Sequence, residues 1–173
     1  MILVTGESGQ LGTSFKKVLP DAFYPSEADF DFTAVDAMRE FLAATAPDAI
    51  IKCAAHTAVD RAEEEESLAD QLNATAVGIL AEYASQRDIP LVTYSTDYVF
   101  NGSGEVPYVE SDPTDPVNAY GRTKRRGELL ALEYPGTLVI RTSWVISGTH
   151  PNFVATMLRL AQTHDSLQVV DDQ

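Results

Sequence analysis

The feature that most constrains the fold is a glycine-rich turn placed directly after a short apolar run at the N-terminus. Residues 1–5 read Met-Ile-Leu-Val-Thr, which is typical of a buried strand. The turn spaces its glycines as GxxGxxG over residues 6–12, and helical periodicity follows as far as Pro20. Such a turn lets a ligand approach the N–H groups at a helix start closely, which suits a dinucleotide pyrophosphate. The spacing differs from the commoner GxGxxG, so a plain strand-to-helix turn stays open as an alternative.

The alternation of strands and helices continues along the chain. Further strands are predicted from apolar runs at 49–54, 90–94 and 137–142, with shorter ones at 21–24 and 167–170. Helical connections of this length join parallel strands, so we predict an α/β protein with a Rossmann-type doubly wound parallel sheet and helices on both faces. No repeat or linker interrupts the sequence, and residues 1–173 are expected to form a single NAD(P)-binding domain.

Composition argues against several kinds of partner. The chain has 12 Lys and Arg against 26 Asp and Glu, and the resulting net charge of −14 repels nucleic acid phosphate and anionic membrane surfaces. No apolar run approaches ~18 residues, and the N-terminus does not resemble a signal peptide. The single cysteine, Cys53, permits no internal disulfide. We therefore expect a cytoplasmic protein with no nucleic-acid or membrane partner, while its oligomeric state is left open.

Tyr120 and Lys124 lie four residues apart at the start of a predicted helix, so their side chains share one face. Taken alone, this pair is common on solvated helix surfaces. Thr96 adds a hydroxyl at the end of a predicted strand, on the same sheet edge as the glycine turn. A hydroxyl, a phenol and an ammonium around one point form a proton relay for a carbonyl oxygen, and a dinucleotide beside them is a hydride source.

The sequence lacks the motifs of several other kinds of active site. The chain holds no GxSxG motif, and His56, His150 and His164 lack metal-ligand spacing, so no metal site is predicted.

The loop after residues 21–24 should meet the adenosine half of a dinucleotide, and it is rich in acids with no Arg or Lys for a 2′-phosphate. NADPH and NADH both stay open as cofactors, and the acids favour NADH.

Together these motifs resemble the extended short-chain dehydrogenase/reductase superfamily. The strings VTGESGQLG, AAHTAVDRAE, STDYVFNG, NAYGRTK, RTSW and VVDDQ are similar to its dTDP-4-dehydrorhamnose reductase family, in order and across essentially the whole chain. The resemblance implies NAD(P)H-dependent reduction of the 4-keto group of a nucleotide-sugar, dTDP-4-dehydro-L-rhamnose, to dTDP-L-rhamnose. Family members continue into a smaller C-terminal substrate region, which implies that this chain is the cofactor-binding portion and has little turnover alone.

The resemblance also implies roles for individual residues. Tyr120 would protonate the C4 oxygen, Thr96 would hydrogen-bond it, and Lys124 would lower the pKa of the phenol and hold the nicotinamide ribose. The residues expected to bind the cofactor are Gly6, Gly9, Gln10, Leu11, Gly12, Asp31, Phe32, Ala54, Ala55 and Thr57, with Tyr120 and Lys124. Those expected to contact the sugar are Val59, Asp97, Tyr98 and Trp144. A buried tryptophan that caps a strand is the alternative for Trp144.

Two other functions stay open. One keeps the enzyme and changes the substrate, giving another nucleotide-sugar 4-keto reductase or an epimerase. The other is a non-catalytic subunit, because a branch of relatives regulates methionine adenosyltransferase. The intact set of Thr96, Tyr120 and Lys124 argues against the second.

Overall fold

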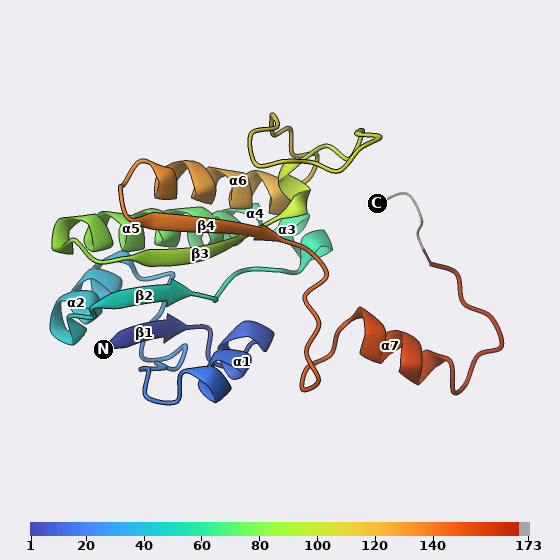
Figure 1. Cartoon of the computed structure of the whole chain (residues 1–173), viewed down its shortest axis with the longest axis horizontal. Coiled ribbons are helices and arrows are strands. Elements are labelled where there is room, and N and C mark those ends of the chain that lie inside the picture. Colours follow the sequence, from blue (N-terminus) through green and yellow to red (C-terminus); the bar gives the residue numbers. More distant parts are fainter. Residues whose placement is uncertain (170–173) are drawn as a thin grey trace.

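The computed structural model describes residues 1–169. Its centre is a sheet of four parallel strands in the spatial order β1, β2, β3, β4 (Figure 1). The strands are β1 (Ile2–Thr5), β2 (Ala49–Lys52), β3 (Leu91–Thr96) and β4 (Thr137–Thr142). All of them are short, and their carboxyl ends meet at one edge of the sheet because they run in the same direction.

Helical segments lie between the strands, and one more follows β4. They are α1 (Gln10–Val18), α2 (Val35–Thr45), α3 (Val59–Glu64), α4 (Glu66–Asp70), η1 (Gln71–Thr75), α5 (Ala76–Arg87), η2 (Asp97–Val99), α6 (Ala119–Leu132) and α7 (Phe153–Leu160). The segment η1 is a single π-helical turn between α4 and α5, and η2 is a short 3₁₀ turn that directly follows β3. No helix in the described part of the chain is both long and apolar enough to cross a membrane.

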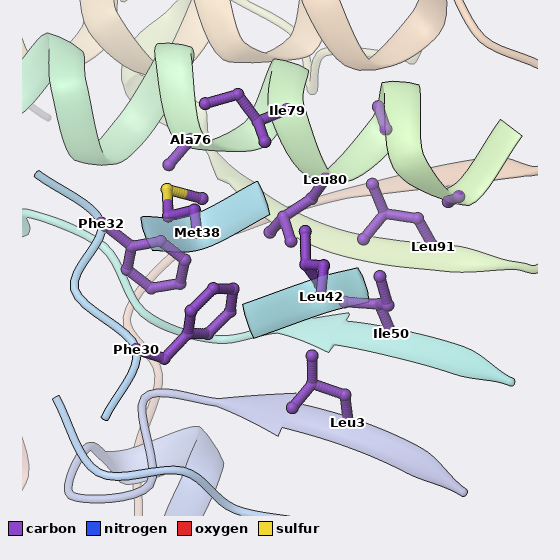
Figure 2. Close-up of a cluster of buried hydrophobic side chains, with 12 residues drawn as sticks. Leu3, Phe30, Phe32, Met38, Leu42, Ile50, Ala76, Ile79, Leu80 and Leu91 are labelled. Atoms are coloured by element: carbon purple, nitrogen blue, oxygen red, sulfur yellow. The ribbon is translucent and has the colours of Figure 1, made fainter. Parts of the chain in front are cut away.

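The main hydrophobic core lies between the sheet and the helices α2 and α5 (Figure 2). The register pairs Leu3 with Ile50 and Ile50 with Leu91, so these side chains share one face of the sheet. They meet Leu42 of α2 and Leu80 of α5, and all five side chains are fully buried. Removal of this apolar surface from water is the main force that holds α2 and α5 to the sheet.

The order in which the chain adds strands to the sheet reverses at β1. On one side of β1 lies β2, and on the other Phe23 forms an isolated parallel bridge with Leu3. Right-handed crossovers that lead in opposite directions place their helices on opposite faces, and α1 indeed lies on the other side of β1 from α5 (Figure 2). The predicted Rossmann-type doubly wound sheet is therefore confirmed. The strand expected at 21–24 is reduced to one bridge, because Pro25 follows and lacks the N–H that a ladder needs.

The face of the sheet opposite to Leu3, Ile50 and Leu91 is less well covered by other elements at β4. Leu138 and Ile140 of β4 are 55% and 36% exposed, although both are apolar. Helix α7 buries none of its side chains and lies away from the sheet (Figure 1). The strand expected at 167–170 is absent over 167–169, and Val170, like the rest of the VVDDQ string after Val169, lies outside the described residues.

Candidate active site

A cavity of about 590 Å³ lies at the carboxyl ends of β1 and β2, next to the reversal of strand order that the Phe23 bridge to Leu3 marks. Open parallel sheets bind their ligands at this position. Of the predicted cofactor-binding residues, those that line the cavity are Gly6, Gly9, Gln10, Leu11, Gly12, Asp31, Phe32, Ala54, Ala55 and Thr57. The fold thus brings three segments of the chain that were identified separately around one volume.

The glycine turn takes its shape from close backbone contacts. Gly6 has a φ of +73°, which L side chains rarely adopt. A Cβ at Gly12 would lie 2.1 Å from the carbonyl oxygen of Gly6, so any larger residue would push α1 away from β1. Gly9 precedes α1 without capping it through a side chain, so the first N–H groups of the helix stay available to a ligand.

A distant segment completes the cavity wall. Val145, His150 and Pro151 line the cavity together with residues near the N-terminus. His150 Nε2 lies 2.8 Å from the carbonyl oxygen of Ser8, and the Ser147 hydroxyl donates to Gln10 Oε1 at 3.0 Å. These residues were not predicted from the sequence, because no local pattern indicates a contact between residues so far apart in the chain.

The reactive hydroxyls gather one strand further along the same edge. Thr96 ends β3 and is 4% exposed, and its hydroxyl donates to Asp97 Oδ1 at 2.9 Å. The rings of Tyr98 and Tyr120 meet edge to face, with centroids 5.7 Å apart. Burial raises the pKa of Tyr120, and hydrogen bonding with the Thr96 hydroxyl opposes this rise. Tyr120 therefore carries its proton at neutral pH beside a second hydroxyl.

Local contacts fix the start of α6 and with it the tyrosine. Asn118 caps the helix, since its side-chain oxygen accepts a hydrogen bond from the Gly121 N–H at 2.7 Å. The Ala119 N–H donates to Glu63 Oε1 at 2.7 Å, which ties the same turn to α3. The first turn of α6 is thus anchored from within and from a neighbouring helix.

Lys124 lies one turn beyond Tyr120 and is 6% exposed. Its ammonium donates to the backbone carbonyl oxygen of Tyr94 on β3 at 2.5 Å. Burial lowers the pKa of Lys124 to about 8, and the nearby Glu128 carboxylate opposes this shift. The pKa of Tyr120 is set by burial, Thr96, Asp97 and Tyr98. The expected effect of Lys124 on the phenol therefore stays a prediction.

A buried ion-pair network holds the next turn of α6. Glu128 is 2% exposed, and its two carboxylate oxygens accept hydrogen bonds from Arg141 Nε and Nη2, both at 2.8 Å. Arg125 adds a third bond at 2.8 Å. Burial raises the pKa of the Glu128 carboxyl, but the bonds from Arg141 and Arg125 outweigh it and hold the pKa below its ordinary value. The network holds α6 against β4 one helical turn beyond Lys124.

Asn73 connects the cavity to the helix that carries the tyrosine. Its side chain is 1% exposed and pairs with both backbone groups of His56, accepting from N–H at 2.9 Å and donating to the carbonyl oxygen at 3.0 Å. The same amide donates to the Thr123 hydroxyl on α6 at 3.2 Å. Asn73 belongs to the π-helical turn η1, a distortion that often marks functional sites.

The residues expected to contact the sugar are less closely grouped. Asp97 and Tyr98 lie in η2 beside Tyr120, and Val59 begins α3, which packs against α6. Trp144 is 57% exposed, with its ring edge-to-face against Phe153 and a φ of 51°. Trp144 is therefore not buried by the part of the chain that the structure describes.

Other ligand chemistries find little support around the cavity. Cys53 lines it, but burial raises the pKa of this thiol to about 12, so it stays protonated and unreactive. Among residues 1–169, no group of three or more His, Cys, Asp or Glu side chains is placed to hold a metal ion.

Comparisons with known proteins agree with this geometry. The model of a family described as RmlD substrate binding domain matches residues 1–173. The dTDP-4-dehydrorhamnose reductase of Escherichia coli K12 is 42% identical over 180 residues, which cover 99% of this chain and 60% of that protein. The chain thus spans 60% of the length of this curated relative.

Solved structures of similar proteins have the same fold. A crystal structure of a dTDP-4-dehydrorhamnose reductase from Clostridium acetobutylicum has a TM-score of 0.93 and 41% identity, over 99% of this chain and 63% of that one. One from Bacillus anthracis, in complex with NADP, has a TM-score of 0.89 and 34% identity, over 94% of this chain and 60% of that one. The family resemblance inferred from the motifs is confirmed: this chain belongs to the RmlD substrate-binding-domain family.

Proposed function

We propose that this chain is the cofactor-binding portion of an NAD(P)H-dependent oxidoreductase that reduces the 4-keto group of dTDP-4-dehydro-L-rhamnose to dTDP-L-rhamnose. The observation that carries the proposal is the buried Thr96 hydroxyl beside the protonated Tyr120, one strand away from the cavity at the glycine turn. The names of the relatives support the reaction, and the NADP complex of the Bacillus anthracis protein supports a nicotinamide cofactor.

The cavity suits a dinucleotide in size and chemistry. Its volume of about 590 Å³ falls within the range typical of small-molecule sites. The uncapped N-terminus of α1 attracts a pyrophosphate, and the space that a Cβ at Gly6 or Gly12 would fill is taken by backbone. In this proposal the residues that hold the cofactor are Gly6, Gly9, Gln10, Leu11, Gly12, Asp31, Phe32, Ala54, Ala55, Thr57, Tyr120 and Lys124.

A bound reduced nicotinamide would supply the hydride that converts the ketone into an alcohol. The part played by this chain is to hold the ketone oxygen and to protonate it. Tyr120 donates the proton, because its raised pKa keeps the phenol protonated at neutral pH. As the phenol O–H bond breaks, its proton moves to the ketone oxygen and a phenolate remains. Thr96 would donate a hydrogen bond to the same oxygen, for which its hydroxyl must turn away from Asp97 Oδ1. The ammonium of Lys124 favours the phenolate that forms as the proton leaves.

Four residues are proposed to face the sugar. Asp97 and Tyr98 follow Thr96 directly in η2, and Val59 begins the helix that packs beside α6. Trp144 supplies an exposed aromatic surface, the type of side chain that stacks on sugar rings. Binding energy from these contacts would orient the ketone without taking part in the proton transfer.

The proposal is tested by titrating NADPH and NADH into the chain by calorimetry, followed by turnover assays with dTDP-4-dehydrorhamnose. The assays use the longest natural protein that contains this sequence. We expect Tyr120→Phe to reduce turnover by at least ~10²-fold and to weaken cofactor binding far less, because it removes only the phenol oxygen and the other cofactor-binding residues stay in place. Tyr134→Phe, beyond the other end of α6, is the matched control and should behave as wild type. Failure of both cofactors to bind contradicts the dinucleotide site, and retained turnover in Tyr120→Phe contradicts the proton donor.

A further inference from the structure

The rim of the cavity opposite β2 is built by the loop that follows Phe23. Seven of its residues line the cavity: Pro25, Ser26, Glu27, Phe30, Asp31, Phe32 and Thr33. The loop extends from the segment that bridges to β1, and in dinucleotide folds this place faces the ribose of the adenosine half. The 2′ position of that ribose is the single chemical difference between NADH and NADPH. The side chains of the loop therefore decide which of the two cofactors fits.

The loop presents negative charge at this rim. Glu27 Oε1 accepts a hydrogen bond from the Ser8 hydroxyl at 3.3 Å, so the carboxylate is held next to the glycine turn. The Asp31 carboxylate accepts bonds from the N–H and the hydroxyl of Thr33, both at 2.7 Å. These bonds lower the pKa of Asp31, which is therefore ionised at neutral pH. Among the residues described as lining the cavity, none is a lysine or an arginine.

Two lysines touch this region, and both are engaged elsewhere. Lys16 forms an ion pair with Glu7 at 2.6 Å while it lies over the ring of Tyr24. Lys52 lies over the ring of Phe32, but it is 2% exposed and its ammonium donates to the carbonyl oxygen of Ala54 at 2.5 Å. Burial and the charge of Lys124 lower the pKa of Lys52 well below its ordinary value. Neither lysine offers a free positive charge at the rim.

We propose that this rim makes the site selective for NADH over NADPH, and that Glu27 is the residue that excludes the 2′-phosphate. The inference rests on the proposed function, since it concerns the cofactor of that site. A carboxylate can accept a hydrogen bond from a ribose 2′-hydroxyl. It repels a phosphate, which carries between about −1.5 and −2 charges at neutral pH. The Bacillus anthracis relative was solved with NADP, so the fold itself does not forbid a 2′-phosphate and the choice depends on the side chains at the rim.

The test is a pair of binding titrations of NADH and NADPH into the chain, read by nicotinamide fluorescence, at low and high salt. At low ionic strength the Kd for NADH should be lower than that for NADPH by about tenfold or more. Glu27→Gln keeps an acceptor oxygen for Ser8 and removes the charge, so it should bring the two Kd values closer together, chiefly by tighter NADPH binding. Glu27→Arg should reverse the preference.

Two controls isolate the site from the overall field. Glu105→Gln removes the same charge from the exposed loop between η2 and α6 and should leave the ratio unchanged. Lys16→Gln should also leave the ratio of the two Kd values unchanged, because this lysine pairs with Glu7. Equal or tighter binding of NADPH by the wild type overturns the selectivity, as does a ratio that Glu27→Gln does not change. Binding of NADPH alone overturns this inference and leaves the dinucleotide site intact, whereas binding of neither cofactor overturns both.

Discussion

Gly121 in the first turn of α6 lies against the backbone carbonyl of Tyr98 in η2, so closely that a Cβ on it would stand 2.2 Å from the oxygen. This contact sets the distance between the helix that carries Tyr120 and the turn that follows Thr96. Glycine weakens a helix, and its presence here reflects the need for close approach.

Replacement of Gly121 by alanine should therefore separate α6 from η2. We expect Gly121→Ala to lower the free energy of unfolding by ~1–3 kcal/mol, because backbone must move to admit the methyl group. Gly78→Ala is the control, since the atoms nearest to its Cβ would be those of the Leu130 side chain, the first at 3.3 Å, and no backbone atom is among them. That change should be neutral or stabilise by up to ~1 kcal/mol. Urea unfolding of both variants checks the prediction, and equal stability of the two would refute it.

The lowered pKa of Lys124 predicts that the free energy of unfolding depends on pH. A variant that lacks this titrating group shows its share of the effect. Its folded pKa of about 8 lies below the ordinary value, so between these two values the unfolded chain holds a proton that the folded chain has released. Stability should therefore rise with pH in this window. Relative to Lys124→Met, which cannot titrate, the wild type should gain about 2 kcal/mol between pH ~7 and pH ~10.

Chemical unfolding of both proteins across this pH range provides the measurement. The tyrosines titrate in both proteins, so their contributions cancel to first order in the difference. The charge of Lys124 lowers the pKa of Lys52, so the loss of this coupling forms part of the measured difference. A constant difference with pH would show that Lys124 keeps an ordinary pKa when folded.

Removal of the Glu128 carboxylate alone should lower the free energy of unfolding, because both arginines of the network stay charged. Glu128→Gln leaves the partly buried guanidinium groups of Arg141 and Arg125 without a carboxylate, and we expect a loss of up to ~3 kcal/mol. Glu105→Gln, on an exposed loop, should change stability by less than ~0.5 kcal/mol. The double variant Glu128→Gln with Arg141→Gln should lose less than the sum of the two single changes, since the second removes the charge that the first leaves unpaired. Additive losses in urea unfolding would contradict the coupling.

Much of the fold could be predicted because its signals are local. The run before Gly6, the glycine spacing and the helix around Tyr120 each follow from neighbouring residues, and the carboxyl edge of a parallel sheet then brings them together. The prediction of a strand at 21–24 was too long, because the aromatic residues Phe23 and Tyr24 do not extend a ladder where Pro25 lacks the N–H donor. The strand at 167–170 would need a partner beside it, and residues 167–169 have none among the described strands.

The site was predicted in part for the same reason. The residues that approach the cavity from β1 and β2 could be found from sequence, whereas His150 could not, because its contact with Ser8 depends on how a distant segment returns across the glycine turn. The buried Lys52 was also missed, since nothing in an apolar run with one lysine shows that the ammonium finds a carbonyl. The role of Asn73 could not be predicted either, because its bonds with the backbone of His56 depend on how the π-helical turn η1 packs against that loop.

The hydrogen bond from Lys124 to the Tyr94 carbonyl oxygen limits how many ligand groups this ammonium can bind. A protonated lysine has three N–H donors and no acceptor, and one donor is already occupied by the strand. Two donors therefore remain for hydroxyl groups of a ligand. On losing its proton the amine would keep a single free donor and would gain a lone pair, so the same side chain would turn from a pure donor into a mixed donor and acceptor. Because this change falls at a pKa of about 8, mild alkalinity would alter which hydroxyl orientations the site can hold, in addition to removing its charge.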